Sequence, residues 1–115
     1  MKTTNHEVIF AIVNAGYAED AMHVAREEGV RGGTIINGRG VAREDEATFF
    51  GITIHADKEI LMMVVEKEIR DQVLHALYKR MGMQKKAQGI VFSLPVSDVA
   101  GLATIEQENE HKKHN

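Results

Sequence analysis

Two places in the sequence combine residue types that can hold an anion. Gly38-Arg39-Gly40 puts one cation between two glycines, which can turn backbone N–H groups toward a negative charge. The same triplet is also typical of a plain turn between strands, and no Gly-Lys-Ser/Thr follows that would make it a P-loop. Lys85-Lys86 is the second place, and it is either a phosphate contact or a solvated pair of charges in a loop.

Histidines and methionines raise the question of a metal site, since the chain has six of each. No two histidines form an H-x-x-x-H or HExxH pair, so surface imidazoles are the simpler interpretation. The methionines fall at strand and helix spacings, which favours core packing over soft-metal binding. We therefore predict no metal site in the set His6, His23, His55, His75, His111 and His114.

Covalent catalysis has no candidate machinery in this chain. It contains no cysteine, which excludes disulfides, thiolate metal sites and cysteine nucleophiles. Ser93 and Ser97 have no histidine and aspartate arranged around them in a known motif. We predict that the protein is not an enzyme. The charged run 43–46 either docks a partner, holds magnesium through Glu44, or is a solvated loop.

The overall composition is that of one ordinary globular domain. The chain has 115 residues, 43% of them hydrophobic and 27% charged, and a net charge of −3. An acidic chain does not favour nucleic acid as a partner. No run of ~18 apolar residues predicts insertion into a membrane. The first seven residues have no apolar signal region, so we expect a cytoplasmic location.

These residues need a scaffold, and the hydrophobic pattern supplies one. Apolar runs and turn signals predict strands at 7–14, 34–37, 58–65 and 89–94, with a weaker one at 49–55. Helical spacing predicts helices at 18–28 and 66–81, and Ser97 could cap a short helical turn over 97–102. The order β-α-β-β-α-β predicts an α+β, ferredoxin-like fold: an antiparallel sheet with both helices on one face.

The other face of that sheet would have no helix to cover it. The strands at 7–14 and 58–65 are nonetheless apolar on both faces. Soluble proteins rarely expose a large apolar patch, so we predict that copies of the chain associate through this face.

Four segments in order resemble the PII-type nitrogen-regulatory signal proteins, in a divergent PII-like branch. They are VIFAIVNAGYAEDAM, GVRGGTIINGRG, KEILMMVVEKEIRDQVLHAL and AQGIVFSLPV, and the resemblance covers about residues 8–105. It implies a homotrimer that binds adenine nucleotides (AMP, ADP or ATP) in clefts between subunits. It also implies a flexible T-loop, here at about 40–57, that docks on a regulated protein such as a membrane transporter. The domain would span 1–105, and 106–115 would be a disordered polar tail.

The resemblance carries particular residues into this site. Ile12 matches the residue beside the base, Thr34 the threonine that starts the second strand, and Gly40 the glycine at the T-loop entrance. Lys58 matches a lysine at the T-loop exit that pairs with phosphate or carboxylate. Gly89 matches the second glycine of the B-loop pattern GDGK. With the residues named above, the predicted binding set is Ile12, Thr34, Gly38, Arg39, Gly40, Lys58, Lys85, Lys86, Gln88 and Gly89.

Three cations of the family pattern are replaced. The GDGK lysine is Ile90, and the two phosphate-binding arginines are Gly101 and Ala103. Each lost contact removes about 1.5–3 kcal/mol of charge-assisted hydrogen bonding, which favours a nucleotide with fewer phosphates unless Lys85, Lys86 or nearby arginines substitute. The predicted T-loop contains no tyrosine, so we do not expect tyrosyl modification.

Two other functions fit the same pattern. One is a divalent-metal-binding trimer like the CutA-type proteins, motivated by the histidines and methionines. The other is an interaction scaffold that keeps the trimer and has lost its ligand, motivated by the missing cations.

Overall fold

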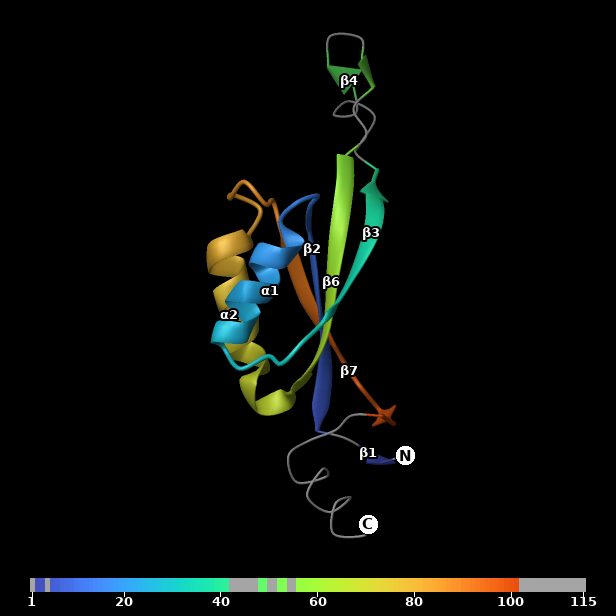
Figure 1. Ribbon diagram of the computed structural model, residues 1–115, viewed down its shortest axis with the longest axis vertical. Helices are drawn as coiled ribbons and strands as arrows, with labels where there is room; N and C mark the ends of the chain where they lie inside the picture. The colour runs from blue at the N-terminus through green and yellow to red at the C-terminus, as the bar shows by residue number, and fades with distance from the viewer. Residues whose placement is uncertain (1, 4, 42–47, 50–51, 54–55, 102–115) are drawn as a thin grey trace.

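A four-stranded antiparallel sheet carries two helices on one of its faces (Figure 1). The computed structural model describes residues 2–3, 5–41, 48–49, 52–53 and 56–101. The sheet has the strand order β3-β6-β2-β7. In chain order, the sheet strands and the helices are β2 (His6–Asn14), α1 (Ala18–Glu27), β3 (Thr34–Gly40), β6 (Ala56–Glu66), α2 (Lys67–Met81) and β7 (Ile90–Pro95). This confirms the predicted order β-α-β-β-α-β and the α+β class.

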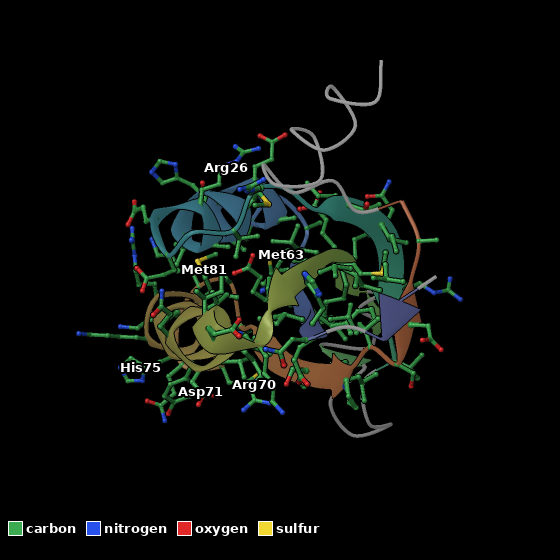
Figure 2. All side chains as sticks on the ribbon, turned by 90° about the horizontal axis from the view of Figure 1, so that it is seen from below. Arg26, Met63, Arg70, Asp71, His75 and Met81 are labelled. Atoms are coloured by element: carbon green, nitrogen blue, oxygen red, sulfur yellow. The ribbon has the colours of Figure 1, made fainter. Side chains whose placement is uncertain are left out.

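The two central strands divide their side chains between two environments, as the pleat of a strand requires. In β2, Ile9, Ala11 and Val13 are fully buried, and residues between them are only partly buried. In β6, Leu61, Met63 and Val65 are buried in the same way. These side chains pack under α1 and α2, and both helices lie on this side of the sheet (Figure 2).

Each helix presents a buried stripe to this layer. In α1 the buried residues include Ala21, Met22 and Ala25, and Gly29 follows with a φ of +103°, a conformation that suits glycine at a helix end. In α2 the buried residues are Val73, Leu77 and Met81, four residues apart. The spacing of four therefore predicted this stripe.

A buried carboxylate joins α2 to the start of the sheet. Glu7 is 6% exposed and accepts a 3.1 Å hydrogen bond from Arg70. The Arg70 side chain also donates to Asp71 at 3.0 Å, and these residues are labelled in Figure 2. The hydrogen bond to Glu7, followed by the contacts with Asp71, raises the pKa of Arg70. Arg70 thus stays charged and compensates the carboxylate that the fold removes from water.

Within the described part of the chain, no helix lies on the opposite face of the sheet, as predicted. Pairing aligns Phe10 with Met62 on one side and with Phe92 on the other. The rings of Phe10 and Phe92 stack at 5.3 Å between centroids. Several large apolar side chains here are 38–52% exposed. We call this the open face; it consists of Val8, Phe10, Ile12, Thr34, Ile36, Ile60, Met62, Val64, Ile90, Phe92 and Leu94.

The predicted helical turn at 97–102 is wrong. Asp98 and Val99 instead form the short strand β8 (Asp98–Val99), which pairs with β1 (Lys2–Thr3). Only a few residues separate Pro95 from Gly101, whose φ is +96°, and a segment this short does not nucleate a helix. Backbone pairing with the N-terminal segment satisfies its polar groups instead.

Within the predicted T-loop the structure describes one small hairpin. The strands β4 (Thr48–Phe49) and β5 (Ile52–Thr53) pair with each other, in place of the single weak strand expected over 49–55. The charged run 43–46 and the predicted tail at 106–115 lie outside the described residues. No helix among the described residues is long and apolar enough to cross a membrane.

Candidate ligand-binding site

The predicted site residues meet mainly at one end of the sheet, where the chain enters and leaves the T-loop. Strand pairing puts Gly38 of β3 opposite Lys58 of β6, and Lys58 opposite Asn14 of β2. Asn14 then bonds the segment before β7, donating its backbone N–H to the Ala87 carbonyl at 2.8 Å. Four segments far apart in sequence therefore form one row, which we call the T-loop end of the sheet.

Lys58 is held in this row by an amide. Its Nζ donates a 2.7 Å hydrogen bond to Oδ1 of Asn14. Asn14 in turn donates from Nδ2 to the Lys86 carbonyl at 3.1 Å. Sequence reasoning missed Asn14; the available signal was a polar residue that ends a strongly apolar strand. Among the described residues, no carboxylate lies within ion-pair distance of Lys58.

Two carboxylate residues flank Lys58 in β6, Asp57 and Glu59, and Glu59 is engaged in hydrogen bonds of its own. Oε1 of Glu59 accepts hydrogen bonds from the backbone N–H of Gly16 at 2.8 Å and of Ala18 at 3.0 Å. These groups lie at the start of α1, where a negative charge also interacts favourably with the positive end of the helix dipole. Because Lys58 and Glu59 are successive strand residues, they lie on opposite faces of the sheet. The Lys58 side chain therefore lies on the open-face side, away from the Glu59 carboxylate.

A tight loop joins this row to α2. Gly89 donates its backbone N–H to the Met81 carbonyl at 2.7 Å, and a Cβ at position 89 would collide with that carbonyl oxygen. Gln88, just before it, has a φ of +50°, a conformation unusual for a residue with a side chain. Glycine is thus needed at 89 for close packing, and the loop 82–89 has a defined shape at the T-loop end.

A groove of about 490 Å³ opens farther along the sheet, between β6 and the segment that joins α1 to β3. Thr34 lines it, as do Met62, Val64 and Arg31. Gly33 lets the connecting segment approach closely, since a Cβ there would lie 2.9 Å from Leu61 and Met63 side chains. We call this space the α1–β3 groove.

The backbone of β6 is free on one side within this groove. Pairing between β3 and β6 begins at Thr34 opposite Met62. From Met63 to Glu66, no strand of the described part of the chain pairs with β6 on that side, while β2 pairs with it on the other. An unpaired strand edge offers alternating N–H donors and C=O acceptors. Such an edge can bond the donor and acceptor groups of a planar base.

Lys85 and Lys86 line a second, smaller cavity of about 270 Å³. It lies beside α1 and the end of α2 and also includes Tyr17, Asp20 and Arg80. This cavity is on the helical side of the sheet, because Tyr17 and Met81, which also line it, pack against the core. The two lysines are exposed, so their long side chains have room to reorient.

The ten predicted residues therefore fall into three places in a single chain. The T-loop end holds Ile12, Gly38, Lys58, Gln88 and Gly89, with Arg39 and Gly40 in the last two pairs of β3, opposite Asp57 and Ala56. Thr34 lies in the α1–β3 groove, four strand residues from Gly38, or ~13 Å along the strand. Lys85 and Lys86 line the helical-side cavity.

A metal centre has no support among the described residues, where no three His, Asp or Glu side chains gather. His23 lies 3.2 Å from Glu27, which also accepts a 3.0 Å hydrogen bond from Arg80. His55, His111 and His114 lie outside the described residues.

Comparison with known proteins identifies a family and solved structures that resemble this chain. The family Nitrogen regulatory protein P-II matches residues 6–106. No curated protein matches the sequence significantly. The structure of Arabidopsis thaliana PII bound to citrate has a TM-score of 0.61 and 23% identity, over 86% of this chain and 82% of that one.

A second similar structure is CPII, a nitrogen regulatory PII-like protein from Thiomonas intermedia K12, bound to ADP, AMP and bicarbonate. Its TM-score is 0.64 at 16% identity, over 88% of this chain and 100% of that one. Both structures share the fold of this chain. Because the family match extends over nearly the whole sequence and both helices and all four sheet strands are in place, the chain belongs to the nitrogen regulatory protein P-II family.

Proposed function

We propose that three copies of this chain form a regulatory trimer that binds an adenine nucleotide between neighbouring subunits. The nucleotide state would set the shape of the T-loop, which docks on a regulated protein; a membrane transporter is our first candidate. The observation that carries the proposal is the unpaired edge of β6 beside Thr34 in the α1–β3 groove. In this proposal the protein transmits a signal and turns over no substrate, and it works in the cytoplasm.

The groove suits the nucleoside half of such a ligand. Its volume of about 490 Å³ admits a purine with its ribose, within the usual range for small-molecule sites. Met62 and Val64 provide apolar contact for the faces of the base, and the free edge of β6 faces its polar rim. The Thr34 hydroxyl is a donor and acceptor for the sugar.

The phosphate half needs the T-loop end of the sheet. Lys58 supplies a cation there, and Gly38 to Gly40 supply backbone N–H groups. Within a single chain, the T-loop end and the α1–β3 groove lie apart from each other. Association through the open face would let the groove of one subunit meet the T-loop end of another. The small number of cations favours ADP or AMP over ATP. The ligands in the CPII structure, which include ADP and AMP, agree with this choice.

Calorimetric titration with AMP, ADP, ATP and adenosine tests the proposal. We expect ADP to bind, and Thr34→Val to weaken all four ligands by about 2- to 10-fold, since one hydrogen bond is lost. Tyr78→Phe is the matched control, because it removes a hydroxyl from a side chain that is 70% exposed on α2 and should change nothing. An intact trimer that binds no nucleotide would be an interaction scaffold and would overturn the proposal.

A further inference from the structure

We infer that Asn14 is a positioning and charge-selecting residue for the ligand's anion, acting through Lys58. This inference rests on the proposed function, which supplies the anion. It comes from the hydrogen bonds of one side chain, whose Oδ1 accepts from Lys58 at 2.7 Å while its Nδ2 donates to the Lys86 carbonyl at 3.1 Å.

Strand pairing and the bond to Asn14 set the direction of the Lys58 side chain. Asn14 and Lys58 are directly opposite in the antiparallel pair, so their Cβ atoms are neighbours on the same face of the sheet. They continue the row of Ile12 and Ile60, which belongs to the open face. A free lysine would lose rotamer entropy on binding an anion. The hydrogen bond to Asn14 restricts the side chain beforehand and so lowers that cost.

The positive charge of Lys58 is paired with a neutral group. Lys58 is partly buried, and its ammonium group donates a hydrogen bond to the neutral amide of Asn14. An aspartate at this position would form an ion pair with the ammonium group and cancel its charge. The amide holds the side chain and leaves the charge available to a phosphate or carboxylate. The two carboxylate residues that flank it along the strand, Asp57 and Glu59, project from the other face of the sheet, and Glu59 is engaged with the start of α1.

Asn14 also links Lys58 to the loop 82–89. Asn14 makes two bonds to this loop, from its backbone N–H to the Ala87 carbonyl and from its side chain to the Lys86 carbonyl. The next residue, Ala15, donates to the Asp57 carbonyl at 3.0 Å, next to Lys58. One short segment therefore joins the exit of the T-loop to the loop before β7. An anion that moves Lys58 would therefore shift Asn14, and with it both the exit of the T-loop and the loop 82–89.

The test compares Asn14→Asp, Asn14→Ala and Lys58→Met with the unchanged chain, using ADP and adenosine as probes in calorimetry. We expect Asn14→Asp to weaken ADP by about 10- to 100-fold, the value of one charge-assisted contact, and to leave adenosine unchanged. Asn14→Ala should weaken ADP binding less than Asn14→Asp does, because Lys58 then loses its hydrogen bond to Asn14 but gains no neighbouring carboxylate. In the Lys58→Met background, Asn14→Asp should cause no further loss, since Asn14 acts through Lys58.

Gln72→Glu is the matched control. It makes the same amide-to-carboxylate change in a side chain that also donates to a backbone carbonyl, that of Glu28, on the helical side of the molecule. It should leave the ratio of ADP to adenosine affinity unchanged. Equal losses for Asn14→Asp in the presence and absence of Lys58 would overturn the inference. The inference would also be overturned by a folded Asn14→Asp chain whose ratio of ADP to adenosine affinity is unchanged, as expected for Gln72→Glu.

A second probe separates this inference from the proposed function. Inorganic phosphate is titrated while the amide signals of Gly38 and Lys58 are followed by NMR. If no nucleotide binds but phosphate shifts these signals, and Asn14→Asp abolishes the shift, the nucleotide proposal fails and the role of Asn14 stands. If nucleotides bind and the Asn14 variants behave like the unchanged chain in both assays, the nucleotide proposal stands and the role of Asn14 fails. If neither probe binds, both fail.

Discussion

At the scale of single residues, the position of Lys85 and Lys86 is the least expected result. The sequence suggested that they substitute for lost phosphate contacts, and the structure puts them in a cavity on the helical side. The Lys86 backbone nevertheless belongs to the T-loop end of the sheet, through its bond with Asn14. Their flexible side chains can extend from there toward a phosphate that arrives from the other side.

Replacing both lysines by alanine tests this reach. We expect Lys85→Ala/Lys86→Ala to weaken ADP by at least about 10-fold while adenosine binding stays the same, because only ADP carries phosphates. Calorimetry measures both constants. Lys79→Ala, an exposed lysine at the end of α2, is the control for a general loss of positive charge. Equal weakening of ADP and adenosine would assign the two lysines no part in phosphate binding.

At the scale of elements, the loop 82–89 depends on one glycine. The Met81 carbonyl occupies the place where a side chain at 89 would begin, and a Val13 methyl group lies 3.2 Å from it. This packing holds the end of α2 against β2 and fixes the segment that Asn14 bonds. The loop is therefore part of the core at one end and part of the candidate site at the other.

Gly89→Ala should destabilise the fold by about 1–3 kcal/mol, the usual cost of overpacking a well-filled site. It should also weaken ADP, because the Lys86 carbonyl would shift from Asn14. Gly32→Ala is the matched control, since a Cβ at position 32 meets no atom within 4 Å. Urea unfolding of both variants gives the difference. A Gly89→Ala chain as stable as Gly32→Ala would contradict the packing argument.

The elements themselves were largely predictable from the sequence. Repeats of four residues marked the buried stripe of α2, and apolar runs marked β2 and β6, because burial imposes these periods on any sequence. The segment 97–102 was misassigned because its partner, β1, is near the other end of the chain, and local propensity contains no information about distant pairing. The same limit hid Asn14, whose meaning depends on residues 44 and 72 positions away.

At the scale of the whole molecule, the open face dominates. Ile90, Phe92 and Leu94 are 40–52% exposed in a row on β7, beside the stacked rings of Phe10 and Phe92. Such a continuous apolar face is typical of a surface that is covered by other chains. Polar cross-strand pairs lie at both ends of this face, His6 with Glu66 and Asn14 with Lys58. Association would therefore bury the apolar part between them and leave the T-loop end at the margin.

Phe92→Glu should dissociate the proposed trimer. A carboxylate in the centre of a buried apolar interface loses its hydration without gaining a partner, which costs several kcal/mol per subunit. Sedimentation equilibrium should give three times 12.8 kDa for the unchanged chain and 12.8 kDa for this variant. Tyr78→Glu puts the same charge on an exposed aromatic of α2 and should leave the mass unchanged. A Phe92→Glu chain with the mass of the unchanged protein would exclude the open face as the interface.

The placement of Lys58 and Glu59 on opposite sides of β6 has a consequence for folding errors. If β6 paired one residue out of step, the two side chains would exchange sides, because the pleat alternates. The ammonium group would then face the start of α1, and the carboxylate would face the incoming anion. A misaligned copy would be less stable, and under the proposed function its open-face side would repel the nucleotide phosphate. The Lys58-Glu59 dipeptide therefore ties correct strand pairing to ligand binding.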